Sequence, residues 1–121
     1  MRDAIKSLKA LSDETSMRVI NLVLQRECCV CEVMHALDIS QSKASRHLSA
    51  LYDAGFLKLR KDGLWSLYSV DEKELKGYQK DLVNSVKKII SHNKLTESDT
   101  ERLSTVKRRV LNNTDAVCVS E

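Results

Sequence analysis

Residues 30–55 read VCEVMHALDISQSKASRHLSALYDAG, and they contain two short helical patterns separated by a turn. Apolar residues recur at helical spacing in the first pattern, which runs to Leu37. Ser40 can then cap a second helix, and Gly55 stands where the end of that helix is expected. Two short helices joined by a tight turn are typical of a helix-turn-helix.

The residues that follow predict a β-hairpin. Leucines alternate with basic residues over residues 57–61, which indicates a strand. Asp62 and Gly63 form a strong hairpin-turn signal, and a second run rich in aromatic residues comes after them. A hairpin directly after a helix-turn-helix makes a winged helix, so we predict a mainly α fold with a small β-hairpin.

The flanking residues predict further helices. On the N-terminal side, apolar residues indicate a short first helix up to Leu11 and a second over residues 14–26. On the other side, an apolar stripe runs from Leu75 to Ile90, residues 97–113 can make another helix, and the last residues look like a tail. We therefore predict a winged helix-turn-helix DNA-binding and dimerisation domain over residues 1–95 and a C-terminal helix and tail over 96–121. The Leu75–Ile90 stripe and the first helix have too little core to cover them, which favours a homodimer.

Composition restricts the compartment and the chemistry. The chain has 121 residues, 42% hydrophobic residues, no proline and a net charge of +3, as expected for one modest, mostly helical domain. It has no apolar run long enough to cross a membrane, and its charged N-terminus is unlike a secretory signal. We expect a cytoplasmic protein with no membrane partner. Thiols stay reduced in the cytoplasm, so its four cysteines indicate metal or redox chemistry rather than disulfides.

The second helix of the opening stretch has a polar N-terminal end without acidic side chains. A recognition helix meets the DNA groove with this end, and side chains of these types contact phosphates and base edges. A solvated helix face has a similar composition, but the basic hairpin, which can lie beside the DNA backbone, favours double-stranded operator DNA as the partner. The predicted DNA-binding residues are Gln41, Ser42, Lys43, Ser45, Arg46 and His47 on the helix and Lys58, Arg60 and Lys61 on the hairpin.

Residues 3–93 resemble the ArsR/SmtB family of metal-sensing repressors. The resemblance rests on CVC followed by an acidic residue at 29–32, SKASRHL at 42–48 and RKDGLWSLY at 60–68. It implies a homodimeric winged-helix repressor that leaves its operator when it binds a metal or metalloid. The sequence departs from the ELCVCDL pattern of the arsenic and cadmium/lead branches at Cys28, where an aliphatic residue is usual. It also has Met34 where some arsenic sensors carry a third cysteine.

Three thiols within four residues indicate a site for a soft ion. Side chains two apart on a helix, such as those of Cys29 and Cys31, point about 200° apart, so one ion held by both should distort that turn. Trivalent arsenic or antimony binds three sulfurs in a pyramid, whereas zinc and cadmium prefer about four ligands. We therefore predict As(III) or Sb(III) as the inducer, bound by Cys29 and Cys31, with Cys28 as the favoured third ligand and Cys118 as the alternative.

Three other interpretations stay open. The thiols can act as a redox switch on the same DNA-binding scaffold, or they can sense cadmium or lead. The cadmium/lead branch of the family uses further cysteines from an N-terminal extension, and residues 1–9 contain none. A thiol-dependent reductase is the third interpretation, but the sequence has no glycine-rich phosphate loop and no histidine-acid set for general base work. We therefore expect no enzyme activity and no organic cofactor.

Overall fold

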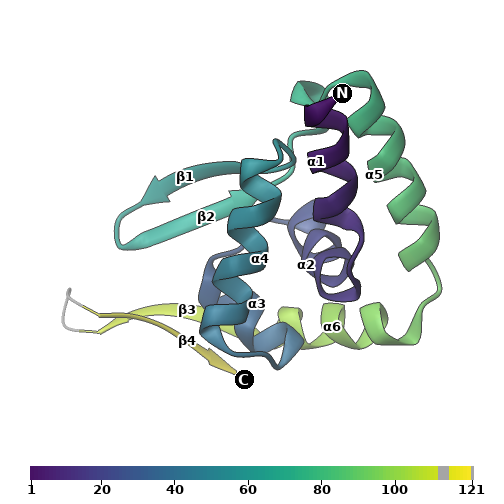
Figure 1. Ribbon diagram of the computed structural model, residues 1–121. Helices are drawn as coiled ribbons and strands as arrows, with labels where there is room; N and C mark the ends of the chain where they lie inside the picture. Colours follow the sequence, from purple (N-terminus) through teal and green to yellow (C-terminus); the bar gives the residue numbers. More distant parts are fainter. Residues whose placement is uncertain (112–114, 121) are drawn as a thin grey trace.

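The computed structural model describes residues 1–111 and 115–120, with side chains through residue 108 (Figure 1). This part of the chain is mainly helical and contains two antiparallel hairpins. The elements are α1 (Arg2–Leu11), α2 (Glu14–Gln25), α3 (Val30–Leu37), α4 (Gln41–Asp53), β1 (Lys58–Asp62), β2 (Trp65–Ser69), the 3-10 turn η1 (Glu72–Glu74), α5 (Gly77–Ile90), α6 (Lys94–Thr105), β3 (Val106–Leu111) and β4 (Asp115–Ser120).

The predicted helix-turn-helix is formed by α3 and α4. Asp38 ends α3 in the left-handed conformation, with φ 55°, which turns the chain out of the helix. Ser40 then caps α4, because its side chain accepts a hydrogen bond from the backbone N–H of Lys43. The boundaries of α4 agree with the predicted helix, and Gly55 follows its end with φ 90°.

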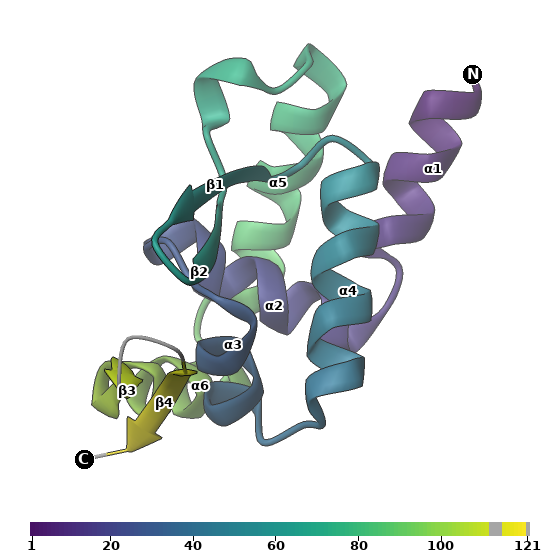
Figure 2. The ribbon, with the colours of Figure 1, turned by 90° about the vertical axis from the view of Figure 1, so that its left-hand side faces the viewer.

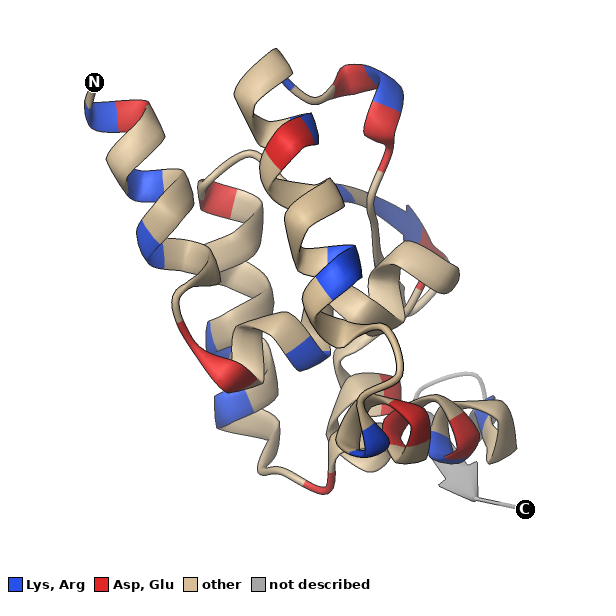
Figure 3. Cartoon of the chain, turned by 90° about the vertical axis from the view of Figure 1, so that its right-hand side faces the viewer, with Lys and Arg blue, Asp and Glu red and all other residues tan. Residues whose placement is uncertain are grey.

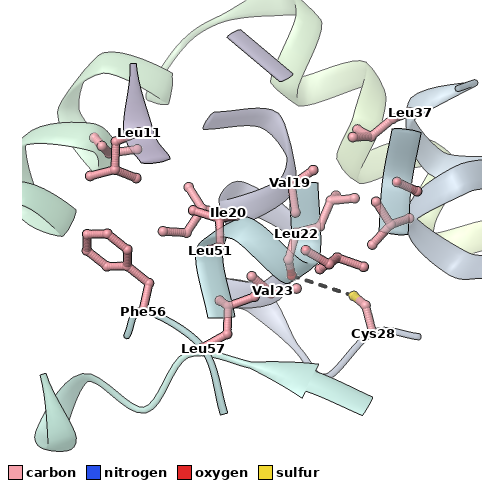
Figure 4. Packing of buried hydrophobic residues seen from close by; sticks show 14 of the residues in the cluster. Leu11, Val19, Ile20, Leu22, Val23, Cys28, Leu37, Leu51, Phe56 and Leu57 are labelled. Atoms are coloured by element: carbon pink, nitrogen blue, oxygen red, sulfur yellow. Dashed lines mark hydrogen bonds between the residues drawn. The ribbon is translucent and has the colours of Figure 1, made fainter. Parts of the chain in front are cut away.

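The hydrophobic core is centred on α2, and α1, α4 and α5 pack around it (Figure 4). Apolar residues on α2 recur every three or four positions, so one face of this helix is fully buried. Burial of each large apolar side chain is worth about 1.5–3 kcal/mol, which fixes α4 against α2. The buried residues include Leu11, Val19, Ile20, Leu22, Val23, Leu51, Phe56 and Leu57.

The predicted wing is the hairpin of β1 and β2. Its register pairs Lys58 with Ser69 and Asp62 with Trp65, and Gly63 takes φ 60° in the turn between them. Leu67 on β2 is buried, whereas all five residues of β1 are exposed. The winged helix-turn-helix prediction is therefore confirmed.

The C-terminal prediction was wrong in part. A helix was expected over residues 97–113 and a tail after it, but α6 ends at Thr105 and the chain continues as the β3–β4 hairpin. Valine-rich runs lie on both sides of Asn112, Asn113 and Thr114, a composition that favours a hairpin. The hairpin packs against α3, and α6 packs against α2 and α3. The predicted domain boundary at residue 95 lies inside α6.

A buried ionic cluster fixes α6 to the helix-turn-helix. The carboxylate of Asp99 is fully buried and accepts hydrogen bonds from Arg18, at 2.8 Å to each oxygen, and from Arg102 at 2.7 Å. Arg18 also donates to the carbonyl oxygen of Leu37, and Arg102 donates to that of Ala36. Both carbonyls belong to the last turn of α3, so α6 is clamped to the end of α3 that leads into the recognition helix.

No helix in the described part of the chain is long and apolar enough to cross a membrane.

Candidate thiol site and nucleic-acid interface

The N-terminal end of α4 has a polar surface that is open to solvent. Gln41, Ser42, Ser45 and Arg46 are exposed, and Lys43 is half-buried. Within the described residues, these side chains make no hydrogen bond or ion pair. Their donors and acceptors are therefore available to a ligand that approaches α4 from solvent.

His47 differs from its neighbours because it faces α2. Its Nδ1 lies 3.0 Å from the hydroxyl oxygen of the buried Ser16, and its ring is half-buried. Burial lowers the pKa of His47, and the nearby cations Arg46 and Lys43 lower it further, against the opposing effect of Asp13. In this position His47 packs between α4 and α2, in addition to its predicted contact with DNA.

Each basic side chain of the wing has an acceptor on the protein. Lys58 contacts Asp71 at 3.3 Å and Glu74 at 3.5 Å, and Lys61 donates to the hydroxyl of Ser66. The carboxylate of Asp71, followed by the charge of Glu74, raises the pKa of Lys58. Figure 3 shows basic residues along β1 and acidic residues over the neighbouring 3-10 turn. The wing is thus less available to an anion than α4.

Arg60 makes the wing's only bidentate ion pair among the described residues. Its Nε and Nη2 donate to the two carboxylate oxygens of Glu27, at 2.6 Å and 2.7 Å. This hydrogen-bonded pair lowers the pKa of Glu27 and raises that of Arg60. Glu27 begins the thiol segment, which we define as residues 27–31. Arg60 therefore joins the predicted DNA-binding wing to the predicted metal site.

The thiol segment also pairs with the wing through its backbone. The N–H of Cys28 donates to the carbonyl of Tyr68 at 2.9 Å, and the N–H of Tyr68 donates to the carbonyl of Cys28 at 2.8 Å. This isolated antiparallel bridge places the thiol segment beside β2. Figure 2 shows the start of α3 between the wing and the β3–β4 hairpin.

Cys28 and Cys29 lie in different apolar clusters. Adjacent residues of an extended segment point to opposite sides, and Cys28 points into the main core, where its exposed fraction is 0%. Its Sγ lies 3.9 Å from the carbonyl oxygen of Leu22 (Figure 4). Burial raises the pKa of the Cys28 thiol to about 12. Cys28 therefore resembles a small core residue more than a metal ligand.

Cys29 and Cys31 share a second, smaller cluster. Cys29 is 3% exposed and packs with Leu67 of the wing and Val106 of β3, and the partly buried Cys31 and Trp65 pack against them. Cys29 is the N-cap of α3, with extended backbone, and only Cys31 lies within the helix. The 200° separation expected for two helical residues therefore does not apply to this pair.

Glu32 organises the start of α3. Its buried carboxylate accepts a hydrogen bond from the backbone N–H of Cys29 at 2.9 Å and one from Arg26 at 2.6 Å. Arg108 of β3 approaches the same carboxylate at 3.7 Å. An open cavity of about 380 Å³ lies beside these three charged side chains. The turn that carries the thiols is thus held by charges from Arg26, directly after α2, from Glu32 in α3 and from Arg108 in β3.

Cys118 lies where side chains are not described, but its backbone position is defined. It is the cross-strand partner of Arg108, on the hairpin that packs against α3. Among the described side chains, no three potential ligands form a metal-binding group. Sequence reasoning predicted Cys29 and Cys31 as ligands but gave no sign of Trp65 and Arg108 as neighbours of the predicted site. Pairing between segments far apart in the chain brings these neighbours in, and local spacing carries no signal for it.

Comparison with known proteins places the chain in a family. The family model described as "Bacterial regulatory protein, arsR family" matches residues 13–64. The "Arsenical resistance operon repressor" of Bacillus subtilis is 32% identical over 78 residues, which are 64% of this chain and 74% of that protein. The chain belongs to the ArsR family. Because this is a family of regulatory proteins, the expectation that the chain is not an enzyme is confirmed.

Two further similarities accompany the ArsR family match. The "Arsenic resistance transcriptional regulator ArsR1" of Pseudomonas putida is 48% identical over 61 residues, which are 50% of this chain. The chain spans about half of that relative's length, 48%. Among solved structures, the homodimeric winged helix-turn-helix DNA-binding domain of a possible ArsR-family regulator from Mycobacterium bovis superposes with a TM-score of 0.62 at 20% identity. The match covers 77% of this chain and 82% of that one, and it supports the fold.

Proposed function

We propose that this chain is a transcriptional repressor that binds operator DNA through α4 and the wing and is released by trivalent arsenic or antimony. The proposal that the chain binds DNA rests on the N-terminal end of α4, where the polar side chains make no hydrogen bond or ion pair within the described residues. Side chains of this kind at the start of a recognition helix can contact base edges and phosphates without first breaking a bond within the protein. Membership of the ArsR family supports the same function.

We propose that the repressor is a homodimer formed through α1 and α5. These helices lie side by side, on the opposite side of the molecule from the two hairpins (Figure 1). They expose large apolar side chains, with Leu8 50% and Ile89 58% exposed and Ile5 and Tyr78 beside them on the same helices. A second copy would bury these residues, and the Mycobacterium bovis relative is described as homodimeric. A dimer would present two recognition helices to DNA half-sites.

The inducer is proposed to bind at Cys29 and Cys31. Both thiols belong to one small cluster at the start of α3, and sulfur is the ligand that soft ions prefer. Arsenite would exchange its three hydroxyl groups for three thiols: three S–H and three As–O bonds would break, three As–S and three O–H bonds would form, and three water molecules would leave without a change of oxidation state. Relatives named as arsenic resistance regulators support this inducer.

The proposed third ligand is Cys118 rather than Cys28. Cys28 was favoured from sequence because a loop to the chain end costs entropy to close. In the structure α6 and the hairpin already close that loop, and β3 contacts the thiol cluster through Val106. Cys28 would have to leave the core to reach an ion held by Cys29 and Cys31, which would cost the burial of its side chain.

A DNA-binding titration tests the first part of this function. The probe is labelled DNA selected from a random pool by the full-length protein. Arg46→Ala should weaken binding by about 1–3 kcal/mol and relax the preference for one base, because a bidentate base contact is lost. His47→Gln is the matched control on the same helix, and it should change base preference less because His47 faces α2. Unchanged binding by Arg46→Ala would show that α4 does not read DNA.

X-ray absorption spectroscopy of the arsenite-loaded protein tests the ligand set. We expect three sulfur neighbours of arsenic in the wild type and in Cys28→Ala, and two in Cys118→Ser. The opposite result, with a sulfur lost only in Cys28→Ala, would restore Cys28 as the third ligand. Dissociation from DNA under oxidant without arsenite would instead favour the redox interpretation.

A further inference from the structure

The thiol segment is attached to the wing by several contacts that binding of a metal ion does not need. Three contacts of different kinds join them. Arg60 of β1 forms its bidentate ion pair with Glu27. Cys28 and Tyr68 exchange two backbone hydrogen bonds. The side chain of Cys29 packs against Leu67.

These contacts follow the order of the chain, residue by residue. Glu27 contributes an ion pair at the surface, Cys28 contributes backbone hydrogen bonds, and Cys29 contributes packing of its buried side chain. A short extended segment that is fixed at three successive residues cannot move its thiols while its partner stays in place, because packed interiors deform little. The partner is the wing as a whole, because Arg60 lies on β1, Leu67 and Tyr68 lie on β2, and the two strands are paired along their whole length.

We infer that Glu27 is a positioning residue that couples the thiol site to the wing, so that inducer bound at Cys29 and Cys31 moves Arg60, which is proposed to lie beside DNA. This inference rests on the proposed function. It adds a route for the signal: from the thiols through Glu27 to the Arg60 guanidinium, and through the Cys28–Tyr68 bridge to β2. The wing would therefore respond to the inducer directly, before any change in α4.

The structure gives a chemical reason for motion in this segment. Cys29 lies outside the regular helix and Cys31 lies inside it, so their backbone conformations differ. A pyramidal site with three sulfurs needs both Sγ atoms on one arsenic atom. The N-cap residue can adjust to this demand more easily than a residue within the hydrogen-bonded helix, so Cys29 and the residues before it should move.

The test measures how strongly arsenite weakens DNA binding, expressed as the ratio of the two DNA dissociation constants, in the full-length protein. Glu27→Gln keeps the size of the side chain but removes its charge. We expect this variant to lower the ratio by about 3-fold or more, since coupling carried by one link is a small multiple of thermal energy. Its affinity for arsenite without DNA should stay within about 2-fold of wild type, because Glu27 is not one of the proposed ligands and its carboxylate is bonded to Arg60.

Asp71→Asn is the matched control. It weakens a wing ion pair, that of Lys58, which does not involve the thiol segment. Asn retains an oxygen that can accept the hydrogen bond from the backbone of Lys73. In Asp71→Asn, the ratio of the DNA dissociation constants with and without arsenite should therefore equal that of the wild type. An equal loss in both variants would mean that any wing charge matters and would overturn the role of Glu27.

A second measurement does not depend on a variant. Hydrogen exchange at the Tyr68 amide, which is bonded to Cys28, should change when arsenite binds. Emission from Trp65, the single tryptophan of the chain, reports binding itself because Trp65 packs against the thiol cluster. A Trp65 response without any change at Tyr68, or an unchanged ratio in Glu27→Gln, would overturn the coupling and leave the proposed function standing. If arsenite neither binds the wild type nor releases its DNA, the proposed function and the proposed coupling are both wrong.

Discussion

The wing and the β3–β4 hairpin lie on opposite sides of the same thiols but are attached in different ways. The wing holds the thiol segment by two backbone hydrogen bonds and an ion pair at the protein surface. The C-terminal hairpin follows α6, which is fixed by the buried carboxylate of Asp99 and two arginines. A surface ion pair contributes little to stability, whereas a buried one that loses a partner is costly. We conclude that the wing is the side that can move and the C-terminal side is the fixed support.

The largest expected effect comes from breaking the fixed side. Asp99→Ala leaves the partly buried guanidinium of Arg18 without its carboxylate partner, which should lower the free energy of unfolding by about 3 kcal/mol. Urea denaturation followed by circular dichroism measures this change. Glu27→Gln, the equivalent change on the wing side, should leave the denaturation midpoint nearly unchanged. Equal losses in the two variants would remove the distinction between a fixed and a movable side.

A smaller effect should separate the two hairpins in DNA binding. Lys61 on β1 and Lys107 on β3 are both exposed, but only the wing is proposed to lie beside DNA. Lys61→Ala should weaken binding to all sequences alike and reduce the slope of log affinity against log salt by about 1. Lys107→Ala should leave the slope as in the wild type. If Lys107→Ala alone reduces it, the C-terminal hairpin is the one that meets DNA.

The smallest expected effect is on the pH dependence of stability. It arises at His47 on α4 and not at either hairpin. Burial lowers the pKa of His47 in the folded protein, so the unfolded chain takes up this proton more readily. Stability from the neutral ring is therefore present above about pH 6.5 and is lost as pH falls from there toward the lower pKa of the folded state. Denaturation midpoints at pH 7 and pH 5 should differ less in His47→Gln than in the wild type. An identical pH dependence in both proteins would assign the effect elsewhere.

The two hairpins also show how far the sequence could be read. The wing was predictable because Asp62 and Gly63 form a strong local turn signal between two alternating strands. The C-terminal hairpin was missed because Leu103, Val106 and Val110 continue the helical spacing of α6, so a longer helix was the simpler interpretation. The helix instead ends at Thr105, and Val106 lies in the same apolar cluster as Cys29, which is 77 positions away in the chain.

The cysteines show the same limit. Their number and spacing predicted a thiol site, but spacing alone made Cys28 the nearest third ligand. The bridge to Tyr68 makes the segment extended, and this turns Cys28 into the core. Cys118 is the proposed third ligand because the hairpin that carries it, far from Cys29 and Cys31 in the sequence, packs against α3. Local patterns therefore predicted a thiol site, whereas the choice of the proposed third ligand depends on long-range packing.

The most direct test is an arsenite titration of the preformed complex between the protein and its selected DNA, followed by fluorescence anisotropy. The wild type should be released, and Cys29→Ser and Cys31→Ser should bind DNA normally but need about 100-fold more arsenite or fail to be released, because a neutral oxygen is a poor ligand for a soft ion. By linkage, DNA should weaken arsenite binding to the wild type by the same factor. Release of both serine variants at the wild-type arsenite concentration would contradict a sensor built on these two thiols.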